Sequence, residues 1–170
     1  MDFELSNRQK QIRMAAREFA EGELAPIGKE CEETRDFPRD IIKKAAQLGF
    51  VGVFIKKEYG GLGLGTLEHV IILEEFWRAE PGLGQIFSQT TFGADELLLF
   101  GTEEQKKKYL PPLVKGDWVM GFAITEPEAG SDPASATTRA EKVGDEYVIN
   151  GNKVMISNGT EAKFLLVYCL

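Results

Sequence analysis

The chain has 170 residues, 43% of them hydrophobic and 28% charged, with a net charge of -7 and a pI near 4.9. This composition is that of a globular protein with a buried core, and its acidic balance excludes a nucleic-acid surface, which needs clustered Lys and Arg. Cys31 and Cys169 form no CxxC spacing, so we expect no metal site. No apolar run approaches the roughly 20 residues of a membrane helix, and the N-terminus lacks signal-peptide features. We therefore expect a soluble cytoplasmic protein.

The first two thirds of the chain show helical spacing of apolar residues. Helices are predicted over residues 7–24, 37–48, 66–81, 83–101 and 102–110. Ser6 is a suitable N-cap for the first, and Thr66 for the third. Pro38 lies near the first turn of the second helix, and Gly49 lies just past its end.

The pattern changes near residue 117 to short β-favouring runs separated by turns. The expected strands lie within residues 117–125, 146–151, 152–159 and 162–170. This predicts a helical domain over residues 1–116 and a β-domain over residues 117–170. The last run, "KFLLVYCL", reads as a strand in mid-course, so we expect a fragment of a longer protein.

Three features of the helical part have ordinary structural explanations. The glycines of "YGGLGLG" do not match GxGxxG and follow no clear strand, so a tight turn competes with a phosphate-binding role. His69 has no Ser, Cys or second His at a useful spacing and is interpreted as a packing or surface residue. Glu74 and Glu75 are adjacent and point about 100° apart on a helix, so they cannot face one substrate together.

Several residues of the segment "AITEPEAGSDPAS", residues 123–135, could bind a ligand together. The preceding strand delivers Thr125 to its end. Gly130 would allow a tight turn, and the N–H groups of Gly130, Ser131 and Asp132 could form an anion-binding nest. A phosphate cradle and an ordinary loop both fit this pattern.

The two glutamates of this segment are a poor acid/base pair. Glu126 and Glu128 flank Pro127 and could share a side of an extended chain. Nothing in the sequence desolvates them or separates their pKa values, as acid/base chemistry requires.

The same segment resembles the signature of acyl-CoA dehydrogenases at the positions where that family is restrictive. Four further segments resemble the same family: "GTEEQKKKYLPPLVKGDW", "GDEYVINGNKVMISNG", "YGGLG" and "ILEEF". The resemblance therefore covers essentially the whole chain. It implies an α+β architecture: an all-α N-terminal domain, part of a β-barrel-like domain, and a C-terminal helical bundle that is absent here. It also implies that Glu126 and Asp132 are structural residues that fix the turn.

The resemblance implies FAD as cofactor and assigns site residues. The cofactor-binding residues would be Phe122, Ile124, Thr125, Gly130, Ser131, Met155, Ile156 and Ser157. The acyl-CoA substrate would contact Ser131, Ser88, Gln89 and Phe92. Ser157 replaces the family's usual Thr, whose hydroxyl bonds to flavin N5, where a donor stabilises the charge that arrives with hydride. Met155 stands where the family often has Trp against the flavin.

The implied reaction is α,β-dehydrogenation of an acyl-CoA thioester, with electrons passed to an electron-transferring flavoprotein. The base would be a Glu of the C-terminal domain, beyond Leu170, so the chain alone should not turn over. The full-length protein would be a homotetramer or a homodimer. An oxidase of the same fold and a non-catalytic subunit of a heteromeric dehydrogenase stay open as alternatives.

Overall fold

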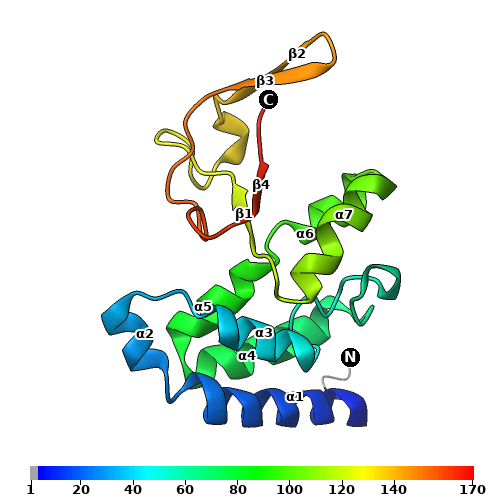
Figure 1. The fold of residues 1–170 in the computed structure, drawn as a ribbon, viewed down its shortest axis with the longest axis vertical. Coiled ribbons are helices and arrows are strands. Elements are labelled where there is room, and N and C mark those ends of the chain that lie inside the picture. Colours follow the sequence, from blue (N-terminus) through cyan, green and yellow to red (C-terminus); the bar gives the residue numbers. More distant parts are fainter. Residues whose placement is uncertain (1–3) are drawn as a thin grey trace.

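The computed structural model describes residues 4–170 and shows a helical part followed by a β part (Figure 1). The helices are α1 (Asn7–Phe19), α2 (Gly28–Thr34), α3 (Arg39–Gln47), α4 (Thr66–Ala79), α5 (Pro81–Thr90), α6 (Ala94–Phe100) and α7 (Glu103–Val114). The strands are β1 (Met120–Ala123), β2 (Arg139–Val143), β3 (Glu146–Asn150) and β4 (Phe164–Val167). The predicted α+β class is confirmed, whereas the division at residues 116 and 117 stays a prediction. No helix within the described range is long and apolar enough to cross a membrane.

The start of α1 follows the sequence signal closely. The Ser6 hydroxyl accepts a hydrogen bond from the Gln9 N–H at 3.3 Å, and the Gln9 side chain accepts one from the Ser6 N–H at 2.9 Å. This reciprocal capping box satisfies two donors that the first helical turn leaves free. After Phe19 the chain continues as a π-helical turn, Ala20–Leu24, so the predicted helix over residues 7–24 is confirmed with a change of hydrogen-bond pattern at its end.

Three details of the helical part differ from the sequence prediction. The predicted helix 83–101 is two helices, because α5 ends at Thr90 and Gly93, with a φ of +102°, is the N-cap of α6. Gly65, not Thr66, is the N-cap of α4, and its N–H donates to the Glu68 carboxylate at 3.0 Å. Helix α2 was not predicted, since its seven residues are mostly charged and show no apolar period.

The β part consists of two separate strand pairs. Strands β1 and β4 pair in parallel, with Met120 opposite Phe164, and β2 and β3 form an antiparallel hairpin. The predicted strand over residues 152–159 is wrong. Two residues of that stretch, Met155 and Asn158, have φ values of 53° and 61°, which an extended strand cannot contain. Strand β2 was not predicted.

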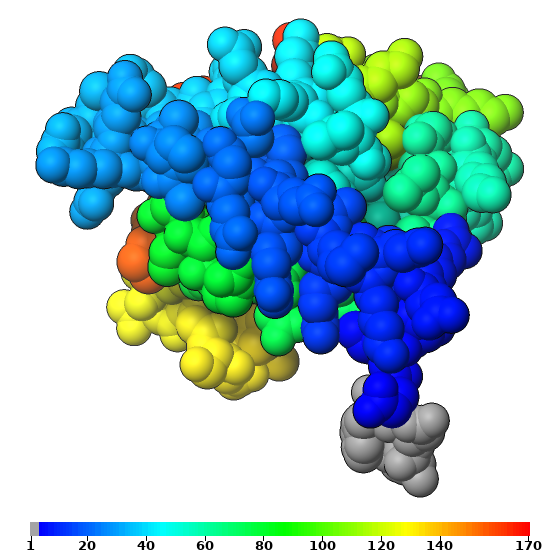
Figure 2. Space-filling model, turned by 90° about the horizontal axis from the view of Figure 1, so that it is seen from below, coloured from blue at the N-terminus to red at the C-terminus, as the bar shows by residue number. Residues whose placement is uncertain are grey.

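Two apolar clusters hold these elements together. The first joins α1, α3, α4 and α5 around Phe19, Phe76 and Phe87, and the rings of Phe76 and Phe87 lie 4.9 Å apart in an edge-on arrangement. The second joins α6 and α7 to β1 around the fully buried Met120 and Leu110. Figure 2 shows α1 and the chain that follows it lying across one face of the helical part. The second cluster fixes β1, and therefore the segment after it, to the helices.

A buried carboxylate joins α1 to α4. Glu75 is only 2% exposed, and it accepts two hydrogen bonds from Arg17 and one from Arg78, all at 2.9 Å. Hydrogen bonds from Arg17, and then from Arg78, hold the pKa of the Glu75 carboxyl below its ordinary value despite its burial. Glu74, by contrast, is largely exposed, so the two adjacent glutamates point in different directions, as their spacing predicts.

Candidate functional site

Thr125 lies two residues beyond the end of β1 and offers two free donors. Its carbonyl oxygen accepts a hydrogen bond from the Val154 N–H at 3.0 Å. Within residues 4–170, neither its N–H nor its hydroxyl has a hydrogen-bond partner. Strand β1 is anchored through Met120 in the second apolar cluster, so the position of these donors is set by the core. The end of β1 therefore presents two adjacent donors to a ligand.

The next residue, Glu126, is buried and joins this loop to Thr137, Thr138 and Lys153 through hydrogen bonds. The residue is only 4% exposed. Its carboxylate accepts hydrogen bonds from the Thr137 N–H at 2.7 Å, the Thr137 hydroxyl at 2.8 Å, the Thr138 N–H at 2.9 Å and the Lys153 ammonium at 2.8 Å. The bond from Lys153, followed by those from Thr138 and Thr137, holds the pKa of the Glu126 carboxyl far below its ordinary value.

This environment corrects one expectation from the sequence. Glu126 is desolvated by burial, contrary to the inference that nothing shields it from water. It is nevertheless no acid/base catalyst, because its oxygens are engaged and it stays ionised. The structural role that the family resemblance implies for Glu126 agrees with these contacts.

The tight turn of the signature segment lies earlier than predicted. Glu126 and Ala129 exchange backbone hydrogen bonds of 2.9 and 3.2 Å across Pro127 and Glu128, whereas Gly130 has no positive φ. A Cβ added at Gly130 would meet nothing within 4 Å. The fold of the described chain therefore does not itself require glycine at this position, and the absence of a side chain leaves space beside the backbone.

The backbone after Gly130 also offers free donors. The N–H groups of Gly130, Ser131 and Asp132 have no acceptor within the described part of the chain, and neither does the exposed Ser131 hydroxyl. The Asp132 carbonyl oxygen accepts from the Ser135 hydroxyl at 2.8 Å, which starts a short 3-10 turn over Pro133–Ser135. Free, consecutive N–H groups are the elements from which anion sites are built.

The loop that contains Met155, Ile156 and Ser157 lies against both the β1 segment and α5. Its start is joined to Thr125 by the Val154 hydrogen bond, and its end is joined to α5 because the Asn158 amide donates to the Gln89 oxygen at 3.1 Å. Met155 is 87% exposed, and the exposed Ser157 hydroxyl has no partner among the described residues. The structure thus brings the predicted cofactor loop next to the helix predicted to contact substrate.

The predicted substrate residues fall into two groups. Phe92 is 44% exposed, and its ring contacts that of Phe122 with centroids 5.5 Å apart. The Ser88 hydroxyl, by contrast, donates to the Gln85 oxygen of its own helix at 2.8 Å. Gln89 takes part through its backbone oxygen, which accepts from Asn158. Phe92 and Gln89 are thus connected to the cofactor segments, while the Ser88 hydroxyl proton is already used.

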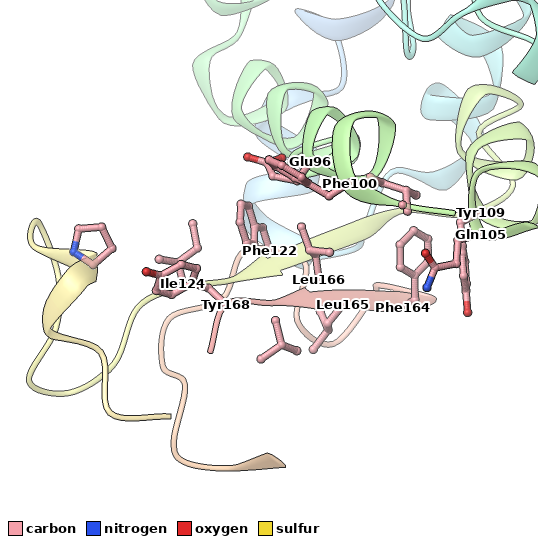
Figure 3. Close-up of a pocket in the computed structure, with 14 residues that line it drawn as sticks. Glu96, Phe100, Gln105, Tyr109, Phe122, Ile124, Phe164, Leu165, Leu166 and Tyr168 are labelled. Atoms are coloured by element: carbon pink, nitrogen blue, oxygen red, sulfur yellow. The ribbon is translucent and has the colours of Figure 1, made fainter. Parts of the chain in front are cut away.

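A cavity of about 790 Å³ opens between α6, α7 and the β1–β4 pair. Its lining includes Phe100, Gln105, Tyr109, Phe122, Ile124, Phe164, Leu166 and Tyr168. Figure 3 shows Phe122 and Leu166 on the strand pair, facing the helix that carries Phe100. Only Phe122 and Ile124 of the predicted cofactor residues line this cavity. The contribution of β4 to the cavity was missed, because the continuous apolar run over residues 164–170 predicts a strand but does not show which ligand surface it faces.

Two models of protein families match the chain. "Acyl-CoA dehydrogenase, N-terminal domain" matches residues 6–117, and "Acyl-CoA dehydrogenase, middle domain" matches residues 121–170. The chain belongs to the acyl-CoA dehydrogenase family. This confirms the family inferred from the signature segment.

Relatives within the acyl-CoA dehydrogenase family cover the whole chain. The short-chain-specific acyl-CoA dehydrogenase of Clostridium acetobutylicum is 42% identical over 171 residues, which is 100% of this chain and 45% of that protein. The acryloyl-CoA reductase (NADH) of Anaerotignum propionicum is 41% identical over 172 residues, which is 100% of this chain and 44% of that protein. The chain therefore spans less than half the length of these curated relatives.

Solved structures show the same fold. A chain in the structure of the electron transferring flavoprotein of Acidaminococcus fermentans has a TM-score of 0.91 at 40% identity, covering 100% of this chain and 45% of that one. The acyl-CoA dehydrogenase of Bacillus anthracis, complexed with FAD, has a TM-score of 0.89 at 35% identity, covering 98% of this chain and 29% of that one.

Two residues that hold this segment of the acyl-CoA dehydrogenase fold in place were not identified from the sequence. Lys153 donates to the Ile124 oxygen as well as to Glu126, and Asn158 bridges α5 and β1 through Gln89 and Met120. The signal for Lys153 was a lysine directly before the apolar run of Val154, Met155 and Ile156. Asn158 gave a weaker signal, namely an Asn–Gly pair typical of turns that need positive φ.

Proposed function

We propose that this chain provides the flavin-facing part of an enzyme that oxidises an acyl-CoA thioester to the trans-2-enoyl-CoA. The observation that carries the proposal is the pair of free donors on Thr125, held beside the loop of Ser157 in a chain of the acyl-CoA dehydrogenase family. The reaction requires that a proton leave the α-carbon and that a hydride leave the β-carbon. FAD, when bound, supplies the hydride acceptor at its N5 atom.

The free groups of the chain fit such a cofactor. A flavin ring carries several acceptor atoms, for which the Thr125 N–H and hydroxyl and the Ser157 hydroxyl are available donors. A pyrophosphate needs consecutive backbone donors without a nearby side chain, and Gly130, Ser131 and Asp132 provide these. FAD complexes among the solved relatives support the same cofactor.

The chain's own residues would bind the cofactor, orient it and exclude water. We assign ring contacts to Phe122, Ile124, Thr125, Met155, Ile156 and Ser157, and pyrophosphate contacts to Gly130 and Ser131. Ser157 would place its proton toward N5, where charge develops as hydride arrives. The contacting rings of Phe92 and Phe122 would shield one side from water. Glu126 is not assigned as the base, because four hydrogen bonds hold it ionised and buried.

Substrate, partner and assembly are part of the same proposal. The acyl-CoA would contact Ser131, Ser88, Gln89 and Phe92, with the Ser88 hydroxyl acting only as an acceptor because its proton is engaged. An electron-transferring flavoprotein would take up the electrons, which the structural relative from Acidaminococcus fermentans supports. We infer a homotetramer or homodimer for the natural protein from the family resemblance.

A second direction of the same reaction has its own support. The relative from Anaerotignum propionicum is an acryloyl-CoA reductase, so it reduces the bond that a dehydrogenase oxidises. The same residues would serve both directions, since a donor at N5 stabilises the same reduced ring. The two directions are distinguished by measuring which CoA thioester, saturated or 2-enoyl, changes the flavin spectrum.

The test is the absorption spectrum of the purified natural protein that carries this sequence, followed by anaerobic titration with saturated and 2-enoyl-CoA thioesters. We expect a bound flavin that bleaches with a saturated thioester. In the reductase direction, the chemically reduced flavin recovers its colour with an enoyl thioester. A protein that stays colourless with added FAD would refute the proposal.

Variants locate the binding groups. Ser131→Ala should weaken FAD binding, and Ser157→Ala should lower the rate of flavin reduction, because each removes a hydroxyl that has no partner among the described residues and is proposed to contact FAD. Thr160→Ala, an exposed residue in the turn after Ser157, is the matched control. Normal flavin content and reduction rate in both serine variants would show that the residues are wrongly assigned.

A further inference from the structure

Lys153 is a buried cation with two well-defined partners. Its side chain is 10% exposed, and its ammonium donates to the Ile124 carbonyl oxygen and to Glu126 Oε1, both at 2.8 Å. The ring of Tyr168 lies 5.7 Å from the same nitrogen. Glu126 is itself fixed by Thr137 and Thr138, so the ammonium is held in one position. The function proposed above does not use this group.

The bond to Ile124 acts on Thr125 through a shared peptide group. The Ile124 carbonyl and the Thr125 N–H belong to the same planar, conjugated unit. A charged donor on the carbonyl oxygen withdraws electron density from that unit and strengthens its N–H as a donor. The Thr125 N–H has no acceptor within residues 4–170, so the added donor strength is not used by the described protein.

The neighbouring residue fixes the other side of Thr125. The Val154 N–H donates to the Thr125 carbonyl oxygen at 3.0 Å. Two consecutive residues, Lys153 and Val154, therefore hold the carbonyl groups on both sides of the Thr125 Cα. This arrangement restricts rotation of the Thr125 backbone and fixes the direction of its free N–H. It also joins that direction to the loop of Met155 and Ser157, which begins at Val154.

We propose that Lys153 is a positioning residue for the flavin, which orients the Thr125 N–H and raises its donor strength through the Ile124 carbonyl. This inference rests on the proposed function, since it takes FAD as the acceptor. Lys153 makes no contact with FAD in this proposal and acts only through the peptide group. An ion pair with a purely structural role is the competing explanation.

The variants separate these two roles. Lys153→Met alone leaves the buried Glu126 without its cation and could fail to fold. The double variant Glu126→Gln/Lys153→Met removes both charges and keeps their volumes, so its core is neutral. Lys153→Arg keeps a charged donor at the same place. Thermal unfolding of each variant without FAD measures the structural role by itself.

We expect the double variant to fold and to bind FAD about tenfold more weakly than the wild type, because the Thr125 N–H loses the orientation and donor strength that Lys153 gives it. Its bound flavin should show a shifted absorption band, and Lys153→Arg should recover part of both effects. If the double variant binds FAD with wild-type affinity and spectrum, Lys153 has only a structural role and the proposal is overturned.

A measurement without FAD tests the peptide group directly. Ile124 and Thr125 form the only Ile–Thr pair in residues 1–170, so carbonyl-¹³C isoleucine and ¹⁵N threonine select this one peptide group within the chain. We expect its ¹³C and ¹⁵N resonances to move in the folded double variant and to return toward wild type in Lys153→Arg. Unchanged resonances would overturn the proposal, whereas a wild-type protein that binds no FAD would refute the proposed function instead.

Discussion

Asn158 donates its side-chain amide to the Gln89 backbone oxygen at 3.1 Å, so the loop that carries Ser157 is fixed to the C-terminal end of α5. The same amide donates to the Met120 oxygen at 3.3 Å. One side chain thereby sets the spacing between the proposed flavin loop, the proposed substrate helix and β1. It does so from a left-handed backbone conformation, with a φ of 61°.

Replacing Asn158 should separate its hydrogen bonds from its backbone strain. Asn158→Ala removes both bonds and keeps a Cβ at positive φ, so we expect a loss of about 3 kcal/mol in the free energy of unfolding. Asn158→Gly loses the same bonds without the strain and should be about 1 kcal/mol less destabilised. Urea unfolding of the two variants measures the difference, and equal midpoints would contradict the strain argument.

Met155 should show opposite effects on stability and on binding. It has a φ of 53° and is 87% exposed, so its side chain contributes almost no burial while its backbone is strained. Met155→Gly is expected to raise the stability of the protein without FAD by about 1 kcal/mol. If Met155 covers the flavin, the same variant should weaken FAD binding. If the variant is more stable and binds FAD with normal affinity, Met155 does not cover the flavin.

Gly130 should tolerate a side chain in the fold but not in the complex with FAD. A Cβ there meets nothing within 4 Å, and its φ is not positive, so Gly130→Ala should leave the unfolding temperature unchanged or slightly raised. FAD binding should fall, because a methyl group would stand beside the proposed pyrophosphate contact. Gly22→Ala, another glycine with open space around it, is the control for which FAD binding should not change. Equal FAD affinity in both variants would place the pyrophosphate elsewhere.

Glu75 should contribute strongly to stability and Glu74 weakly. Glu75→Gln removes a buried charge from between Arg17 and Arg78, and we expect a loss of about 2 kcal/mol in the free energy of unfolding. This is less than for a fully buried pair, because both guanidinium groups are about half-exposed. Glu74→Gln, at an exposed position 3.5 Å from Arg13, should cost under about 0.5 kcal/mol. Comparable unfolding midpoints for the two variants would show that the Arg17–Glu75 contact is energetically unimportant.

His69 should make the helical part less stable in mild acid. Burial lowers the pKa of its imidazole below 6.5, its Nδ1 has no hydrogen-bond partner within residues 4–170, and its ring lies edge-on to that of Phe54, with centroids 5.2 Å apart. The unfolded chain therefore takes up the proton first, so stability is complete above about pH 6.5 and falls as the pH decreases below that value. Thermal unfolding between pH 7.5 and 5.5 should show this decrease. His69→Phe should have a flatter profile, and identical slopes would assign the pH effect to other groups.

Parts of the fold could be predicted because their signals are local. Ser6 and Gln9 are three residues apart, and their reciprocal bonds need only one helical turn to form. The break at Gly93 was missed because a glycine between two apolar helical patterns does not by itself reveal its φ. The strand expected over residues 152–159 failed for the opposite reason. Its alternation fits an extended chain, but the bonds of Asn158 and Val154 to other segments decide its path.

For the candidate site, the sequence by itself determined which segments belong together, because residues 123–135 and 144–159 have a pattern restrictive enough to indicate the family. Only the tertiary structure decided how they meet. Glu126 and Lys153 are 27 residues apart, and Asn158 and Gln89 are 69 apart, so no local rule predicts either contact. Such contacts depend on the packing of β1 against the helices, which brings distant backbone groups within hydrogen-bonding distance. The hydrogen bonds from Lys153, Thr137 and Thr138 keep the buried Glu126 charged, and those from Lys153 and Val154 set the direction of the Thr125 N–H.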